Sequence, residues 1–241
     1  MYCLKLTYFA ACLIYSAHAF NLPPMGLGAI LFRPSGMTTI PMGGDASLSE
    51  ASDFFADAFW TAKVGGGAKE LSKTQRKSLV NRQMLDFQRR YSTNMGNNGK
   101  RAKLMLCRNG KGELMGCAGV EVDSVPTMSL TDGSKSIAPL MSNVAVGKKF
   151  RRRGVAEELV REVEAMVQKD WGFDECYLYV EKINVPAIRL YKKLGYREVW
   201  EDSKARTIVP TENGGVKNAP TVLVCMKKNL KSGPFGSLFR F

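Results

Sequence analysis

Histidine is almost absent from this chain: of its 241 residues, only His18 is one. His18 lies in a segment that resembles a cleavable leader, so we expect the processed protein to contain no histidine. That absence excludes a Ser-His or Cys-His nucleophile pair, a histidine general base and a histidine metal site. Proton transfer in this chain must therefore use other groups, such as carboxylates and tyrosine.

The six cysteines follow no pattern typical of a disulfide framework or a metal site. Two of them, Cys3 and Cys12, lie near the N-terminus. The other four are isolated residues within strand-like runs: Cys107, Cys117, Cys176 and Cys225. A chain of this length can bury its own core without disulfides. We therefore expect buried free thiols in a reducing compartment, and no bound metal.

Acidic residues are missing from the first 44 positions. Lys5 and an apolar stretch over 6–15 are followed by Ala17-His18-Ala19, the small-x-small form of a signal-peptidase site. The segment is too short to span a membrane, so we expect no stable membrane insertion. The next 25 positions resemble a transit peptide. We predict a signal peptide at 1–19 and a transit-like segment at 20–45, a combination that resembles the leaders of proteins sent to plastids of secondary origin. The alternative is a secreted protein with a flexible N-terminus.

The rest of the chain is basic, with 35 Lys and Arg against 22 Asp and Glu and a net charge of +13 for the whole sequence. This excess favours polyanionic partners, such as phosphate-bearing molecules, acidic protein tails or RNA. The hydrophobic content of 45% is ordinary for a globular core. We predict one domain over 46–230 and a loose tail over 231–241.

A strand, a basic glycine loop and a helix follow one another in the middle of the chain. Residues 142–146 have the β-branched content of a strand, and helical spacing of apolar residues from Val155 predicts a helix that begins at about Arg153. The loop carries five cations: Lys148, Lys149, Arg151, Arg152 and Arg153. Cations are unfavourable at a helix N-terminus unless an anion binds there. The loop is therefore predicted to hold phosphate.

A second block predicts a strand over 175–182 and then a short helix. Asn184 is a good N-cap, Pro186 is tolerated in the first helical turn, and Gly195 lies just past the end. One face of this helix is apolar at i, i+3, i+4 and i+7, through Ala187, Leu190, Tyr191 and Leu194.

Together the two blocks resemble the hallmarks of the GNAT superfamily of N-acetyltransferases. Arg151-x-x-Gly154-x-Ala156 is similar to its acetyl-CoA signature, and the run from Asn184 through Tyr191 to Tyr196 is similar to its second motif. The resemblance covers about residues 100–228 and implies an α/β fold with a mixed central sheet flanked by helices.

Before the two blocks, the sequence predicts helices at 47–60 and 68–91 and strands at 102–108 and 113–123. After them it predicts a strand at 196–201, a polar stretch of 20 residues and a strand at 221–227.

The resemblance also implies a site. Acetyl-CoA would lie between the strands at 139–146 and 175–182, with its pantetheine arm along the backbone of Val144, Ala145 and Val146. The pyrophosphate would be held by the next loop: Arg151, Arg152, Arg153, Gly154, Val155 and Ala156. Asn184 would contact the pantetheine, and Tyr191, with an ordinary phenol pKa of about 10, would protonate the departing thiolate. The general base is left open among Glu121, Asp123 and Glu181.

The sequences of both blocks are similar to those of plastid and cyanobacterial GNAT enzymes that acetylate protein N-termini and lysines. The resemblance thus implies acetyl transfer from acetyl-CoA to a protein amine. Two alternatives remain. One is acetylation of a small amine, such as a polyamine or an amino acid. The other is a non-catalytic module that binds RNA, including ribosomal RNA, through its basic loop.

Overall fold

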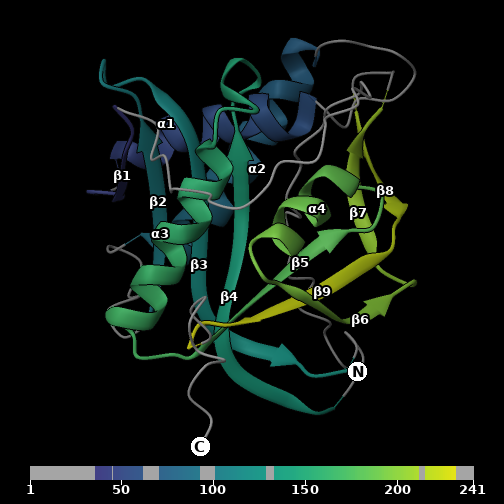
Figure 1. Ribbon diagram of the computed structural model, residues 1–241. Helices are drawn as coiled ribbons and strands as arrows, with labels where there is room; N and C mark the ends of the chain where they lie inside the picture. Colours follow the sequence, from purple (N-terminus) through teal and green to yellow (C-terminus); the bar gives the residue numbers. More distant parts are fainter. Residues whose placement is uncertain are drawn as a thin grey trace, which may run out of the picture.

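A computed structural model describes residues 36–44, 46–61, 71–92, 101–128, 133–211 and 215–231. The predicted signal peptide, the transit-like residues 20–35 and the tail from 232 onward lie outside the described residues. Seven strands form one sheet in the order β1-β2-β3-β4-β5-β9-β6 (Figure 1). Their bounds, in that order, are Thr38–Pro41, Ala102–Arg108, Leu114–Pro126, Lys135–Val146, Glu175–Glu181, Leu223–Asn229 and Arg197–Asp202. The predicted mixed α/β fold is confirmed.

Helices cover both faces of this sheet. α1 (Ala46–Phe55), its continuation η1 (Ala56–Trp60) and α2 (Lys73–Tyr91) lie behind it in Figure 1, whereas α3 (Val155–Lys169) and α4 (Val185–Lys193) lie in front. Alternate residues of each strand point to opposite faces, and each set joins a separate apolar core. Leu104 and Leu106 pack with α1 and α2, and Met105 packs with α3.

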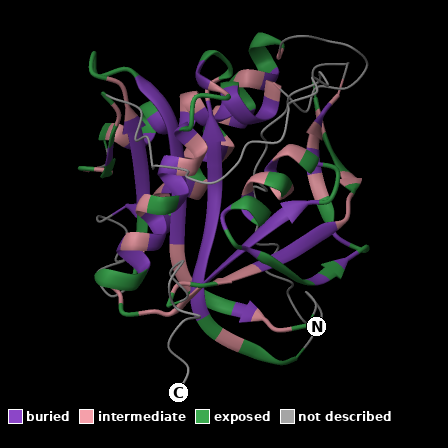
Figure 2. Ribbon diagram, in the orientation of Figure 1, coloured by how far each residue is buried: buried purple, intermediate pink, exposed green. Residues whose placement is uncertain are grey.

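The sheet is almost entirely antiparallel, and only β4 and β5 run parallel. These two strands pair at two positions, Leu140 with Tyr177 and Met141 with Leu178. Beyond them β4 and β5 diverge toward their C-terminal ends, as Figure 1 shows. Both strands are buried along the divergent part (Figure 2).

A β-bulge in β4 lies at the point of divergence. Ser142 pairs with Gly119 and Ala145 pairs with Cys117, so two residues of β4 stand opposite one residue of β3. Asn143, the first of these two, has a φ of 54°, in the left-handed region that asparagine tolerates better than most residues. A bulge bends its strand, and this one lies where β4 leaves β5.

Two elements differ from the sequence predictions in their bounds. α2 begins at Lys73 and not at Ala68, because Ser72 and Gln75 form a reciprocal capping box at its N-terminus. α3 begins at Val155 and not at Arg153, because Arg152 and Gly154 adopt positive φ angles of 64° and 82°.

Two further elements were not predicted. β1 falls within the segment 20–45 that we expected to target the protein, and it pairs along its whole length with β2. The polar stretch after β6 contains a hairpin of β7 (Arg206–Pro210) and β8 (Val216–Pro220). The Gln75 amide of α2 binds this hairpin by donating to the carbonyls of Thr211 (2.6 Å) and Gly215 (2.9 Å).

The four cysteines outside the N-terminal segment are buried and free, which confirms the prediction of buried thiols. Burial raises the pKa of Cys176 and of Cys225 to about 12, which keeps both thiols protonated and unreactive at neutral pH. Among the helices of the described residues, none is long and apolar enough to cross a membrane.

Candidate active site

The divergence of β4 from β5 leaves one edge of β4 without a partner strand over 144–146. The Gly147 N–H group donates to the carbonyl of Met115 on β3 at 3.0 Å. Because peptide groups alternate in direction along a strand, those of Val146 and Val144 point the other way, toward the gap. Ala145, which pairs with Cys117, points toward β3. The gap is therefore bordered by peptide groups able to bind an extended ligand.

The basic loop leads directly from this edge to α3. Gly147 is followed by the short helix η3 (Lys148–Phe150) and a turn over 151–154. Gly154 is the N-cap residue of α3 and supplies no capping side chain, so the first-turn N–H groups of α3 are not capped by a side chain. These N–H groups and the helix dipole attract an anion.

The cations of the loop divide into two kinds. The side chains of Arg152 and Arg153 form no ion pair with any described residue, and Arg153 is exposed. Arg151 is instead bound to the protein: its Nε donates to the Val146 carbonyl (3.2 Å) and its Nη2 to the Ala58 carbonyl (2.8 Å). Burial lowers the pKa of Arg151. Arg151 thus ties the end of β4 to η1, whereas Arg152 and Arg153 are available to a ligand.

Asn184 follows β5 and lies at the same end of the gap as the basic loop, which follows β4. It is the N-cap of α4, as its sequence position predicts, and its Oδ1 accepts from the Ala187 N–H group at 3.3 Å. The side chain is fully buried, and its Nδ2 has no hydrogen-bond partner among the described residues. A buried donor of this kind is costly unless a ligand or water accepts from it.

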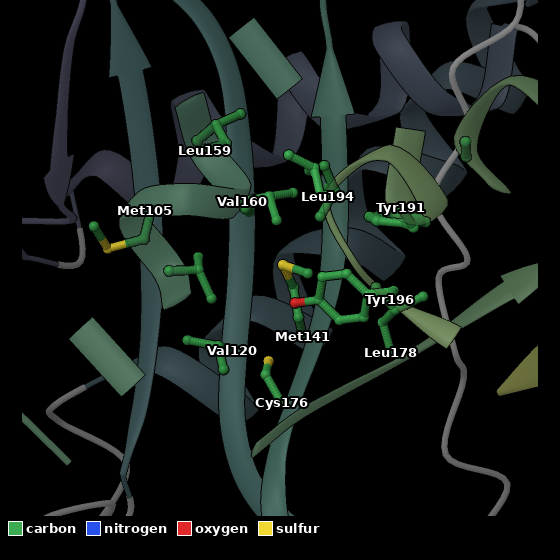
Figure 3. Close-up of a cluster of buried hydrophobic side chains, with 14 of the residues drawn as sticks. Met105, Val120, Met141, Leu159, Val160, Cys176, Leu178, Tyr191, Leu194 and Tyr196 are labelled. Atoms are coloured by element: carbon green, nitrogen blue, oxygen red, sulfur yellow. The ribbon is translucent and has the colours of Figure 1, made fainter. Parts of the chain in front are cut away.

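Tyr191 lies on the buried face of α4, in the core shown in Figure 3. The side chain is 0% exposed, and its ring meets that of Tyr196 edge to face at 5.7 Å between centroids. Leu194 and Leu178 belong to the same cluster. The helical spacing of the second motif correctly predicts this inward face.

The three candidate bases occupy different places. Glu121 pairs with Leu140 across β3 and β4, at the closed end of the gap, and its Oε1 forms an ion pair with Arg90 Nη1 at 2.7 Å. Asp123 is exposed farther along β3. Glu181 is 4% exposed and ends β5, where its carbonyl accepts from the Asn184 N–H group at 2.8 Å. Of the three, only Glu181 lies on the divergent part of the two strands.

A buried polar cluster at the bulge has no counterpart among the sequence predictions. It joins α2, β3 and β4 through Arg90, Tyr91, Glu121, Ser142 and Asn143. Burial raises the pKa of Tyr91. Gly119 and Asn143 were the available sequence signals, since a glycine inside a strand often marks a close approach. The described residues contain no group of three or more side chains suited to a metal ion.

The model of the Acetyltransferase (GNAT) family matches residues 69–196, just over half of the chain. Among curated proteins, the chain is 41% identical over 59 residues to GCN5-related N-acetyltransferase 4, chloroplastic, of Arabidopsis thaliana, covering 24% of this chain and 20% of that protein. It is 37% identical over 57 residues to an N-alpha-acetyltransferase of Saccharolobus solfataricus, covering 24% and 34%. These matches span between about a fifth and a third of the relatives' lengths.

Solved structures resemble the fold over most of the chain. A spermidine N-acetyltransferase SpeG chimera from Vibrio cholerae and hSSAT has a TM-score of 0.53 at 12% identity, covering 82% of this chain and 97% of that one. A GCN5-related N-acetyltransferase from Kribbella flavida has a TM-score of 0.52 at 18% identity, with coverages of 81% and 99%. At such low identities these likenesses bear on the fold alone. Together with the family match, they establish that the chain belongs to the GNAT family of acetyltransferases.

Proposed function

We propose that the protein transfers an acetyl group from acetyl-CoA to a protein amine, at an N-terminus or a lysine, by direct attack of the amine on the thioester. One observation carries the proposal: the unpaired edge of β4 runs directly into the uncapped N-terminus of α3. The first feature suits an extended amide-bearing chain, and the second suits a diphosphate. Coenzyme A joins these two groups in one molecule.

The described residues fit this co-substrate. The peptide group of Val144 and the N–H group of Val146 would pair with the pantetheine arm as an added strand does, while the Val146 carbonyl accepts from Arg151. The N–H groups between Arg152 and Ala156 would hold the pyrophosphate, assisted by the Arg152 and Arg153 side chains. Asn184 has a buried Nδ2 donor to offer to a carbonyl of the arm.

Acetyl transfer requires a neutral amine, a polarised thioester carbonyl and a proton for the thiolate. The N–H groups of the β4 edge are proposed to polarise the carbonyl, as oxyanion donors do. Tyr191 is proposed as the acid. Glu181 is proposed as the base, directly or through water, because it alone among the three candidates lies on the divergent part of β4 and β5.

A protein amine is favoured as the acceptor on two grounds. The curated relatives that match the chain include N-alpha-acetyltransferases. The net charge of +13 also repels polycations. The alternative of a small-amine acceptor is supported by the fold of the SpeG structures. A plastid location is proposed from the leader composition and from the chloroplastic relative.

Calorimetry with acetyl-CoA tests the co-substrate. The wild-type chain is expected to bind it, and an Arg152→Ala/Arg153→Ala variant is expected to bind about tenfold more weakly or worse, since hydrogen bonds to charged groups are worth about 1.5–3 kcal/mol each. Lys103→Ala/Lys111→Ala removes two exposed cations elsewhere and serves as the control. Equal weakening in both variants would show that only net charge matters. RNA binding with a steep salt dependence, and no heat from acetyl-CoA, would support a non-catalytic RNA-binding module instead.

Turnover assays test the assigned roles. Tyr191→Phe and Glu181→Gln are expected to lower kcat while acetyl-CoA binding is retained, and Tyr177→Phe is the control for loss of a hydroxyl. Peptides with free N-termini, lysine peptides and spermidine offered side by side identify the acceptor. Normal turnover by Tyr191→Phe would remove that residue from the mechanism, and a preference for spermidine would overturn the protein acceptor.

A further inference from the structure

The polar cluster at the bulge is built around a buried charge. The Arg90 side chain is 3% exposed and the Glu121 side chain 12%, and their 2.7 Å ion pair lies between α2 and β3. Arg90 Nη1 also donates to the Ser142 hydroxyl at 3.1 Å, and its Nε to Asp86 Oδ1 at 3.1 Å. One guanidinium therefore connects α2, β3 and the residue of β4 that precedes the bulge.

The neighbouring Tyr91 reaches the bulge itself. Its hydroxyl accepts from Asn143 Nδ2 at 3.2 Å and lies 3.4 Å from the Ser142 hydroxyl. The ring fits there because Gly119 has no side chain: a Cβ at that position would stand 2.0 Å from the Tyr91 hydroxyl. Gly119 is also the residue of β3 that pairs with Ser142. The phenol is thus inserted against the sheet at the bulge.

Stability alone does not explain this buried ion pair, because its burial costs free energy. Burying an arginine and a glutamate removes both from water, and well-packed apolar residues often stabilise a fold at least as well. The cluster does, however, bind both Ser142 and Asn143, the two residues at which β4 turns away from β5. Asn143 adopts a left-handed backbone conformation that needs support from its surroundings.

We infer that Arg90 and Tyr91 are positioning residues, which hold the bulge at Asn143 and so orient the open edge over 144–146 toward acetyl-CoA. The inference rests on the proposed function, because the edge matters only if acetyl-CoA binds along it. It also gives Glu121 a role other than that of general base: Glu121 holds Arg90 in place. Neither Arg90 nor Tyr91 needs to touch the substrate.

Hydrogen exchange of the ligand-free full chain tests the positioning without any substrate. Tyr91→Phe keeps the ring and removes only the hydroxyl, and we expect amides over 142–147 to exchange about five- to tenfold faster than in the wild type, the effect of losing about one hydrogen bond. Tyr177→Phe removes a hydroxyl that donates to Glu175 at the start of β5, and we expect it to leave 142–147 unchanged. Glu121→Gln, which removes the charge opposite Arg90, should loosen the same segment as Tyr91→Phe.

Acetyl-CoA titration of the same variants separates positioning from catalysis. Tyr91→Phe and Glu121→Gln should bind acetyl-CoA about five- to tenfold more weakly, and the KM for acetyl-CoA should rise more than kcat falls. If Glu121 is the base, Glu121→Gln will instead lower kcat with unchanged binding and exchange, which overturns its assignment here.

Two further outcomes would overturn the inference. One is an exchange rate over 142–147 that stays at the wild-type value in Tyr91→Phe. The other is an increase spread evenly over the whole sheet, which would indicate loss of global stability alone. Failure of the wild-type chain to bind acetyl-CoA is a separate result, since it refutes the proposed function whether or not the bulge loosens. Should Glu121→Gln fail to fold, Tyr91→Phe still decides between these outcomes.

Discussion

Gly119→Ala is expected to destabilise the protein strongly, although it adds a single methyl group. The new Cβ would stand 2.0 Å from the Tyr91 hydroxyl and 2.6 Å from its Cζ, whereas non-bonded carbon atoms pack at about 3.5–4.0 Å. The ring must therefore move by more than about 1 Å. It is buried, so it cannot move into solvent.

The free-energy change has three parts. Overpacking a core costs about 1–3 kcal/mol. Displacing the hydroxyl breaks its contacts with Asn143 and Ser142, at about 0.5–1.5 kcal/mol for each hydrogen bond. Replacing glycine by alanine lowers the conformational entropy of the unfolded chain, which offsets about 0.4–1 kcal/mol of this loss. The free energy of unfolding should therefore fall by about 1–6 kcal/mol.

Urea denaturation followed by tryptophan fluorescence measures this change. Gly43→Ala is the control, because a Cβ at Gly43 meets nothing within 4 Å, and it should leave the free energy of unfolding within about 0.5 kcal/mol of the wild type. Tyr91→Ala provides the second test: in that background the clash is absent, so Gly119→Ala should cost little more than the control. A Gly119→Ala variant as stable as Gly43→Ala, or an undiminished cost in the Tyr91→Ala background, would refute the reasoning.

Two further predictions concern other parts of the fold. Lys228 Nζ pairs with Glu164 Oε2 at 2.6 Å, and burial nevertheless raises the pKa of Glu164. Lys228→Met should destabilise the protein by about 3–5 kcal/mol at pH 7, because it leaves the buried Glu164 without this partner. A carboxyl group whose folded pKa is raised contributes stability below its unfolded pKa and loses that contribution as the pH rises. The loss of stability caused by Lys228→Met should therefore shrink toward pH 4. Chemical denaturation at both pH values checks this, and a loss that does not change with pH would contradict it. A shortened chain that begins at residue 46 lacks β1, which pairs with β2 at four positions. Its melting temperature should be lower than that of a chain that begins at residue 36. Equal melting temperatures in a thermal scan would show that β1 does not stabilise the fold.

Much of this fold is predictable from residue periodicity. The apolar spacing after Val155 and the β-branched run before Gly147 predict the elements that flank the basic loop, because each element buries one face. β1 and the β7–β8 hairpin are less accessible to such reasoning. Only pairing with β2 makes Thr38–Pro41 a strand, and the hairpin is mostly polar, so neither carries a strong apolar pattern.

The site is predictable in outline but not in its details. The two motifs predict the loop before α3, the Asn184 N-cap and the buried face of α4, and the structure has all three; that they form an acetyl-CoA site stays a prediction. The contacts of Arg151 with η1 and of Arg90 with Glu121 join residues 93 and 31 positions apart, and no local pattern predicts them. No local pattern predicts the bulge either, because the left-handed Asn143 contacts Tyr91 of α2, 52 positions away in the sequence.

A crystal structure of the protein with acetyl-CoA is the most direct test of the central claim. We predict that the diphosphate lies within about 2.7–3.2 Å of backbone N–H groups between Arg152 and Ala156, with the pantetheine arm along the open edge of β4. A complex in which the nucleotide lies away from the N-terminus of α3, or in which the gap between β4 and β5 stays empty, would contradict the account.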